Sequence, residues 1–391
     1  MLAARCSQLE TNRMYEEFNG RAGIAQRLLQ PYRISVYDLI ASKCRGGMSV
    51  FASRFDRNNM PLTKLDLSIA KFSPAKNYYF FNGKFDLCLQ AGLQKWLKTW
   101  QPDIVIVEAN PRNLSTPLMI HWLHKHSCRV IGHGLGVMPL TSGLEKLRNL
   151  GRRGLISLLD GVFAYSSLAA EQYHALGMPT DRIFVAHNAI AAKPTKQPTE
   201  RPPHFAQLPV LLFVGTLIPR KSVDLLLKAY TQIQATPKPV LQIVGDGPSK
   251  RELQELADSL KVNCLFLGDL RGPDLDKVFD AADVFVLPGT GGLAVQEAMA
   301  HALPVIVSKA DGTEADLVRQ ENGWLIEPGD IRALAQRIDD ALSNPRRLRE
   351  MGAASYRIVS SEINIENMSA TFVRGMGIIA SKPLRKHSVA P

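Results

Sequence analysis

The second half of the chain alternates short apolar runs with stretches whose apolar residues recur at helical spacing. Strands of the fully buried kind are predicted at residues 210–214, 240–244, 264–267, 284–287 and 305–307. Helices are predicted between them, at residues 222–234, 250–260, 275–281 and 294–301. Strands that are apolar throughout and joined by helical crossovers are typical of a parallel sheet covered on both faces. The pattern therefore predicts a doubly wound α/β domain.

The first half of the chain shows the same pattern less clearly. Its predicted strands lie at residues 104–107, 129–131, 161–164 and 183–186, and its predicted helices at 114–124 and 169–175. Near the start, the candidate strand is 24–29, which Gln26 and Arg27 interrupt. Either this first strand is degraded or the chain begins downstream of a missing one. Both halves are expected to be Rossmann-like, so the fold class is α/β with two such domains.

A proline-rich segment, residues 192–209, carries no hydrophobic period and is predicted to be an interdomain linker. It separates a domain at 1–191 from a domain at 210–360. Residues 361–391 are expected to form a C-terminal helix that ends near Gly375, followed by a mobile tail. The basic residues of this tail are Lys382, Arg385 and Lys386. Because open parallel sheets bind ligands at the carboxyl ends of their strands, two facing domains predict a site in a central cleft.

A glycine-rich turn, residues 289–292, lies between the apolar run that ends at Pro288 and the predicted helix that carries Glu297. A helix start offers unpaired N–H groups and the positive end of a dipole, and glycines let a ligand approach the backbone. This arrangement suits a diphosphate, and Glu297 follows closely enough to accept a sugar hydroxyl. The turn therefore predicts a nucleotide-linked substrate.

The composition is that of a globular protein, with 46% hydrophobic and 21% charged residues. No apolar run approaches the roughly 20 residues that a membrane-spanning helix needs. The first residues lack the apolar core of a signal peptide. The five cysteines are scattered without a CxxC pair, which indicates reduced thiols, a cytoplasmic location and no zinc site.

The net charge of +11 is concentrated in the first half. Residues 1–190 hold 23 Lys and Arg against 13 Asp and Glu, whereas residues 191–391 hold 24 against 23. A basic surface attracts anionic lipid, nucleic acid or phosphorylated substrates. A basic face that only keeps the protein soluble is an equally good interpretation. Nucleic acid is not expected as a partner, because the chain has no basic block with interleaved aromatics and no nucleic-acid-binding motif.

Four blocks in the second half, in this order and spacing, resemble the retaining glycosyltransferases of family 4, which have the GT-B fold. The blocks are residues 212–221, 241–248, 289–299 and 322–330. Residues 164–167 and 185–190 also match the end of the family's first domain, and the resemblance covers about residues 100–365. It implies two Rossmann-like doubly wound domains facing a central cleft. Residues 1–191 would bind the acceptor and residues 210–360 the nucleotide-sugar.

The resemblance also implies an activity. Family members transfer a sugar from a nucleotide-sugar donor with retention of its anomeric configuration, usually without a metal, so no metal site and no cofactor are expected. Many act on lipid-linked or polysaccharide acceptors at the cytoplasmic face of the membrane. The expected function is transfer of a hexose to a glycan or lipid-linked acceptor in cell-surface polysaccharide biosynthesis. The basic first half would then contact an anionic membrane at its inner face.

The resemblance assigns donor-binding roles in the second half. Lys221 would neutralise charge on the departing diphosphate as a catalytic residue, with Arg220 beside it, and Glu297 would bind the ribose hydroxyls. Two positions depart from the family, because Thr216 stands where a second cation is expected and Gly289 where a second glutamate is expected. The contact to the donor sugar is then either lost or replaced by residues next to Gly289, which are the side chain of Thr290 and the backbone N–H groups of Gly291, Gly292 and Leu293.

Candidate residues of the first half lie after its predicted strands. The resemblance implies that His133, between two glycines, contacts the donor sugar near the reacting carbon as a second catalytic residue, although a lone histidine is often structural. Glu108 would position an acceptor or serve the fold, and Tyr32 and Arg33 would line the acceptor side.

Two other functions stay open. One is a nucleotide-sugar epimerase of the same fold, which would need further acid and base carboxylates. The other is a non-catalytic relative that binds a nucleotide-sugar, an alternative that the departures at Thr216 and Gly289 favour.

Overall fold

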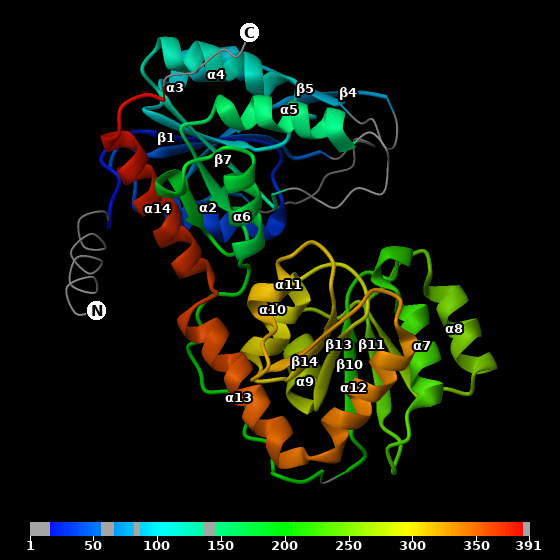
Figure 1. The fold of residues 1–391 in the computed structure, drawn as a ribbon. Coiled ribbons are helices and arrows are strands. Elements are labelled where there is room, and N and C mark those ends of the chain that lie inside the picture. The colour runs from blue at the N-terminus through cyan, green and yellow to red at the C-terminus, as the bar shows by residue number, and fades with distance from the viewer. Residues whose placement is uncertain (1–15, 56–65, 82–86, 137–144, 206, 386–391) are drawn as a thin grey trace. The chain divides into compact units, whose positions relative to one another are not determined.

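The computed structural model describes residues 16–55, 66–81, 87–136, 145–205 and 207–385 (Figure 1). These residues fall into two compact units. The first unit takes its residues from Met1–Asn188 and Ile365–Pro391, and the second from Ala189–Asn364. Each unit is built on its own parallel sheet.

The second unit contains a six-stranded sheet in the order β12-β11-β10-β13-β14-β15. Its strands are β10 (Val210–Val214), β11 (Val240–Val244), β12 (Cys264–Gly268), β13 (Val284–Leu287), β14 (Val305–Ser308) and β15 (Gly323–Ile326). All neighbouring strands are parallel, and Val210 to Val214 pair in register with Val240 to Val244. From β10 the chain adds strands toward one edge as far as β12, and from β13 it adds them toward the other edge as far as β15. This is the doubly wound order, and its switch point lies between β10 and β13. The predicted strands of this half are confirmed.

Helices cover this sheet on both faces. They are α7 (Val223–Gln232), α8 (Lys250–Ser259), α9 (Pro273–Ala281), α10 (Leu293–Ala300), α11 (Glu314–Leu317), α12 (Ile331–Ser343) and α13 (Pro345–Ser361). Local sequence explains where α12 and α13 begin: the side chain of Asp330 accepts a hydrogen bond from the N–H of Ala333, and that of Asn344 from the N–H of Arg347. Pro345 then takes the first helical position, where its missing N–H costs nothing.

The first unit contains a seven-stranded parallel sheet in the order β3-β2-β1-β6-β7-β8-β9. Its strands are β1 (Ala22–Leu28), β2 (Met48–Ser53), β3 (Lys71–Pro74), β6 (Ile104–Glu108), β7 (Arg129–Gly134), β8 (Gly161–Ala164) and β9 (Ile183–Val185). The weak candidate strand near the start does form, as β1 in the middle of the sheet. Gln26 is tolerated there because Tyr37 donates a hydrogen bond to it and its amide donates to the carbonyl of Leu28.

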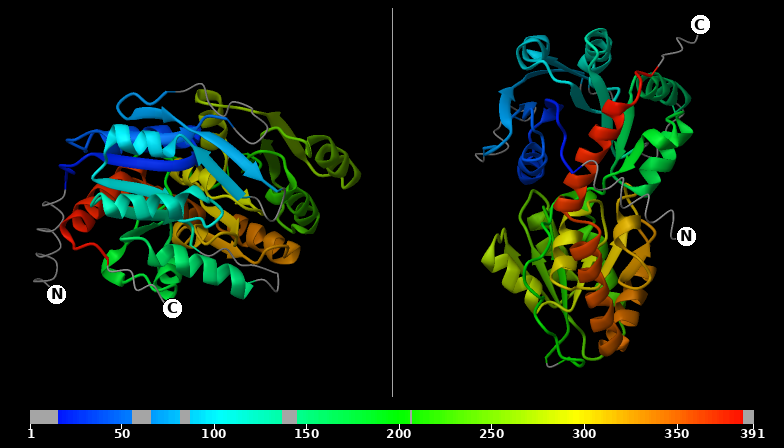
Figure 2. Two further views of the ribbon diagram at one scale, coloured as in Figure 1. Left: turned by 90° about the horizontal axis from the view of Figure 1, so that it is seen from above. Right: turned by 90° about the vertical axis from the view of Figure 1, so that its left-hand side faces the viewer.

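The helices of the first unit are α2 (Ile34–Ala41), α3 (Leu93–Trp100), α4 (Ser115–Lys125), α5 (Glu145–Ser157), α6 (Ser167–Ala175) and α14 (Ile365–Ser381). The first unit also contains a two-stranded antiparallel hairpin, β4 (Lys76–Phe80) and β5 (Leu87–Ala91). Helix α14 returns to this unit from the end of the chain and packs against α2 and β8 (Figure 2). The rings of Phe163 and Phe372 stack there with centroids 4.2 Å apart.

The prediction for the C-terminal region was wrong in two respects. The helix does not end near Gly375, because α14 continues to Ser381. Gly375 serves close packing instead, since a β-carbon placed on it would lie 2.4 Å from the ring of Phe163. The tail is also held as far as Arg385, whose N–H donates to Asp160, and Lys382 donates to the carbonyl of Asp181. Lys386 lies outside the described residues.

Residues 192–205 and 207–209 contain no helix or strand. Arg201 nevertheless fastens this segment to the second unit, because its guanidinium donates to the carbonyls of Phe279, Ala282 and His301. Throughout the described ranges, no helix is both long enough and apolar enough to cross a membrane.

Candidate functional site

The point where strand order reverses in the second unit brings two loops together. One loop follows β10 and includes the short 3₁₀ turn Pro219–Lys221, and the other follows β13 and includes the glycines at 289–292. Because β10 and β13 are paired and parallel, both loops leave the sheet at its carboxyl edge. The N–H of Thr290 donates to the carbonyl of Arg220 over 2.9 Å, which ties the loops directly. The predicted donor-binding segments are therefore neighbours, at the position where open α/β sheets bind ligands.

The ammonium of Lys221 lies between these loops. A β-carbon placed on Gly215 would be 3.8 Å from its Nζ, and one placed on Gly291 only 2.5 Å from it. Gly291 also has a φ of +117°, which favours glycine. Burial lowers the pKa of Lys221 and the charge of Arg220 lowers it further, whereas Asp311 acts in the opposite direction. The ammonium of Lys221 is thus partly desolvated beside glycine backbone. A bound anion at this place would reduce the free-energy cost of burying its charge.

Helix α10 begins beside this cation. Gly292 precedes the helix and supplies no side-chain cap to its first turn. The N–H groups of that turn and the positive end of the helix therefore act together with Lys221 on any anion at this place. Leu293 is the first residue of the helix and is half-buried.

Glu297 lies one turn into α10 and is half-buried. Burial raises the pKa of its carboxyl group; His301 acts to lower it and Asp276 to raise it. Within the described part of the chain, no hydrogen bond to this carboxylate is recorded. A partly desolvated carboxylate in this state is suited to accept hydrogen bonds from hydroxyl groups.

The structure explains why Gly289 stands where the family resemblance expects a glutamate. A β-carbon on Gly289 would lie 2.4 Å from the carbonyl carbon of Lys221 and 2.5 Å from the carbonyl oxygen of Arg220. The two loops are in backbone-to-backbone contact here, so no side chain fits at this position without a shift of the backbone. Thr290 is bound to the same turn through its hydroxyl, which donates to the carbonyl of Arg220 over 3.3 Å. Thr216 is exposed at the start of the turn.

A third loop, after β14, borders the same place and was missed by the sequence analysis. Glu314 is buried and accepts hydrogen bonds from the N–H groups of Ala310 and Gly312 over 2.7 and 3.0 Å. Asp311 accepts a hydrogen bond from the hydroxyl of Thr313, which would lie 3.3 Å from a β-carbon on Gly292. The signal was present as a polar cluster directly after the apolar strand at 305–308, since strand ends of a parallel sheet meet at one edge.

In the first unit, polar side chains line the carboxyl edge of the sheet on one face. Glu108 and His133 are direct partners in the register of β6 and β7. Glu108 is bound by Arg27, whose Nε donates over 2.7 Å and whose N–H donates over 3.0 Å. The carboxylate is therefore already neutralised by its neighbour, although the pair is still partly exposed.

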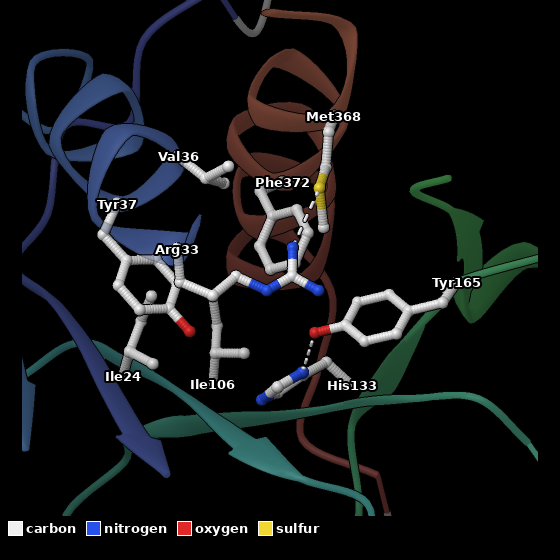
Figure 3. Close-up of a pocket in the computed structure, with 9 residues that line it drawn as sticks. All are labelled: Ile24, Arg33, Val36, Tyr37, Ile106, His133, Tyr165, Met368 and Phe372. Carbon is white, nitrogen blue, oxygen red and sulfur yellow. Dashed lines mark hydrogen bonds between the residues drawn. The ribbon is translucent and has the colours of Figure 1, made fainter. Parts of the chain in front are cut away.

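The imidazole ring of His133 is held by a hydrogen bond at one of its nitrogens, and its other nitrogen is spare among the described residues (Figure 3). Its Nδ1 shares a hydrogen bond with the hydroxyl of Tyr165 over 2.5 Å. Its Nε2 is buried and has no partner among the described residues. Burial lowers the pKa of the imidazole to about 3, and Arg33 adds to the effect. His133 is therefore neutral at physiological pH and keeps one ring nitrogen available for a hydrogen bond.

Arg33 lies inside the first unit rather than on its surface, with only 5% of its area exposed. Its guanidinium donates to the amide oxygen of Asn188 and to the sulfur of Met368, and lies 5.0 Å from the ring centre of Tyr165. Figure 3 shows it crossing a small pocket. The pocket is lined by Ile24, Arg33, Val36, Tyr37, Ile106, His133, Tyr165, Met368 and Phe372. Of the two residues predicted to line the acceptor side, Tyr32 is exposed and Arg33 is not.

The buried imidazole has a consequence for acid stability. The unfolded chain binds a proton at His133 below pH 6.5, whereas the folded chain does so only near pH 3, so stability falls as pH decreases between these values. We expect His133→Asn to reduce this slope by up to about 1.4 kcal/mol per pH unit, the maximum for one proton. Unfolding free energies at pH 7 and pH 5 measure the slope. The exposed His121→Asn serves as the control, and an unchanged slope in His133→Asn would contradict the assignment.

Residues 196–358 match the family model described as "Glycosyl transferases group 1". This match lies within the second unit and includes Lys221, the glycine loop and Glu297.

Among curated proteins, similar chains include two mannosyltransferases. One is a GDP-mannose-dependent monoacylated alpha-(1-6)-phosphatidylinositol monomannoside mannosyltransferase of Corynebacterium glutamicum, 34% identical over 186 residues, which cover 45% of this chain and 48% of the relative. The other is a GDP-mannose-dependent alpha-(1-6)-phosphatidylinositol monomannoside mannosyltransferase of Mycolicibacterium smegmatis, 28% identical over 243 residues, which cover 57% and 62%. The chain spans about half the length of the curated relatives it matches.

Solved structures match over most of both chains. The apo form of the lipopolysaccharide outer core galactosyltransferase WaaB gives a TM-score of 0.66 at 18% identity, covering 90% of this chain and 99% of that one. Sucrose-phosphate synthase from Thermosynechococcus elongatus also gives 0.66 at 18% identity, covering 89% and 96%. At this identity the likeness shows the fold, which agrees with two Rossmann-like units. Residues 196–358 are thus similar to the glycosyltransferases of group 1, and the chain has the GT-B fold.

Proposed function

We propose that this protein transfers a hexose from a nucleotide-sugar to a glycan or lipid-linked acceptor with retention of anomeric configuration. The observation that carries the proposal is the ammonium of Lys221, which lies against the glycine loop at the start of α10. A fixed cation and a helix start together favour a diphosphate and stabilise the charge that develops on it as it departs.

GDP-mannose is the first donor to consider. The two mannosyltransferases from Corynebacterium glutamicum and Mycolicibacterium smegmatis are named for this donor. UDP-glucose is the second, because a structural neighbour, HepE from Anabaena, was solved in complex with it. In either case Glu297 would accept the ribose hydroxyls, and the loop at 289–292 would hold the diphosphate through its backbone.

The first unit would supply the acceptor side and a contact to the donor sugar. The neutral His133 would offer its spare Nε2 to a sugar hydroxyl once donor binding uncovers this buried atom. Exposed Tyr32 and the partly exposed Glu108 would contact the acceptor, with Arg33 supporting them from inside. The names of these relatives include a phosphatidylinositol monomannoside, which supports a lipid-linked acceptor. We propose that the protein acts at the inner face of the membrane in cell-surface polysaccharide biosynthesis.

Retention would proceed without an enzyme nucleophile, as expected of family 4. The bond between the anomeric carbon and the diphosphate oxygen breaks while Lys221 and the start of α10 hold the diphosphate. The acceptor oxygen forms the new bond on the same face of the sugar, and its proton passes to an oxygen of the departing diphosphate. Each residue named here binds or orients a group.

Donor binding tests the proposal without knowledge of the acceptor. A ligand that binds only the folded state raises Tm, by an amount that corresponds to about 2.7 kcal/mol at 100 times its Kd. We expect GDP-mannose or UDP-glucose, and the matching diphosphate, to raise Tm, and Lys221→Ala and Glu297→Ala to reduce the shift. Lys228→Ala, an exposed change on α7, is the control.

The outcomes separate the three candidate functions. No shift with any nucleotide diphosphate or nucleotide-sugar would overturn the proposal. Conversion of the bound sugar without an acceptor would indicate an epimerase. Binding without turnover, in the presence of candidate acceptors, would favour a non-catalytic relative.

A further inference from the structure

The outer face of the hairpin β4–β5 is apolar. Because the strands are antiparallel with Tyr78 opposite Leu89 and Phe80 opposite Leu87, these side chains share one face. Tyr78 is 44% and Phe80 45% exposed, far more than large apolar side chains in a sheet usually are. Phe81 follows and is 70% exposed.

The inner face of the same hairpin is polar and bound to the first unit. Asn77 donates to the carbonyl of Arg27 over 2.7 Å, and Gln90 donates to the carbonyl of Gln26 over 3.1 Å. Cys88, two residues before Gln90 on β5, is buried on this same face. The usual arrangement of a surface hairpin, apolar inside and polar outside, is therefore reversed.

The apolar face continues beyond the hairpin. Cys88 forms a parallel bridge with Asn113, so Leu89 and Leu114, which come next on each side, point to the outer face together. Leu118 lies one turn further along α4 and is 73% exposed. β4, β5 and α4 lie together in Figure 1. We call these six residues the apolar ridge: Tyr78, Phe80, Phe81, Leu89, Leu114 and Leu118.

Two cations lie beside the ridge. The ammonium of Lys76 lies 5.3 Å from the ring centre of Tyr78, and Arg112 is exposed beside Leu114. Exposed aromatic and aliphatic side chains flanked by cations match the boundary of an anionic bilayer, where rings sit at the headgroup level and cations meet lipid phosphates.

We propose that the apolar ridge docks this protein on an anionic lipid bilayer. The proposal deepens the lipid-linked acceptor of the proposed function and rests on it, but its physical basis is separate. Insertion of the ridge removes exposed apolar area from water, and Lys76 and Arg112 supply attraction to the headgroups. The two contributions predict binding that is weakened by salt and by loss of either set of side chains.

Co-sedimentation of the full chain with vesicles tests the proposal. We expect partition onto vesicles of phosphatidylcholine mixed with phosphatidylglycerol, and little onto phosphatidylcholine alone. The combined variant Tyr78→Ser, Phe80→Ser, Leu118→Ser should bind at least about tenfold more weakly, since each buried apolar side chain contributes more than one factor of ten in favourable cases. Lys76→Ala with Arg112→Ala should lower binding roughly 30-fold, at about 1 kcal/mol for each cation.

The control is Leu265→Ser on β12 of the second unit, which removes a leucine that is 50% exposed away from the ridge. The proposal is overturned if the ridge variant sediments with anionic vesicles as the unchanged chain does, or if both vesicle types bind equally. It is also overturned if the ridge variant loses only self-association on a sizing column, because a second copy would then cover this face.

A second measurement separates this proposal from the proposed function. The shift in Tm on adding GDP-mannose or UDP-glucose is recorded for the same variants and should match that of the unchanged chain, which also shows that they fold. A ridge variant that binds donor but not vesicles supports docking. If no donor shifts Tm while the ridge still directs vesicle binding, the transferase proposal fails and docking stands.

Discussion

Lys221→Ala is expected to lower kcat for sugar transfer by about 10²- to 10³-fold, the usual effect of removing one fixed group that stabilises developing charge. The ammonium is positioned by two glycines, Gly215 and Gly291, and stands at the start of α10. Its charge should act most strongly when the diphosphate departs, so kcat should fall more than KM rises.

The same substitution should leave Tm unchanged or slightly higher. Burial lowers the pKa of Lys221, which means that the folded chain holds this cation at a cost. Steady-state kinetics with the donor that raises Tm, together with a melting curve, check both parts. Lys228→Ala on α7, which also serves as the control for donor binding, is the matched lysine-to-alanine control. Transfer at more than a tenth of the normal rate in Lys221→Ala would show that another group holds the diphosphate.

Gly289→Glu is expected to destabilise the second unit, although it restores the residue that the family resemblance expects. Its β-carbon would lie 2.4 Å from the carbonyl carbon of Lys221, so the loops must separate. Gly289→Ala should already cost about 1–3 kcal/mol, the usual range for overpacking, and the glutamate no less. Because the displaced turn carries Lys221, donor binding should weaken in parallel.

Chemical denaturation measures the loss, and Gly151→Ala provides the control. Gly151 lies in α5 with nothing within 4 Å of an added β-carbon, so alanine should be neutral or stabilising there. If Gly289→Ala unfolds at the same denaturant concentration as the unchanged chain, the backbone contact between the two loops is not as tight as the structure has it.

The strands of the second unit could be predicted because each is specified by a short, continuous pattern in the sequence. A strand buried on both faces is an apolar run, so β10, β11 and β13 were predicted at the residues where they occur. The donor-binding candidates are likewise contiguous with these strands. What could not be read locally was the contact between Gly289 and Lys221, which joins residues far apart in the sequence.

The first unit was harder because its strands contain polar residues that are satisfied by distant partners. Ser49 in β2 accepts a hydrogen bond from the indole of Trp96 and shares another with Ser73. Such strands do not show a continuous apolar run. The hairpin β4–β5 was missed although Asn82-Gly83, a recognised hairpin signal, stands between its strands in the sequence.

Arg33 shows a different limit. The sequence analysis predicted that it lines the acceptor side, but its partners Asn188 and Met368 are 155 and 335 positions away. No local pattern records these contacts. The spare nitrogen of His133 is equally invisible in sequence, because it depends on which ring atom Tyr165 binds.

The return of α14 to the first unit has a consequence for how the chain is made. The second unit is an uninterrupted segment, Ala189–Asn364, whereas the first unit requires the 17-residue helix α14 at the far end of the chain. During synthesis from the N-terminus, the second unit can close its core before the first unit receives the helix that covers Phe163 and α2. The part of the core that α14 covers therefore stays open until α14 itself has been synthesised.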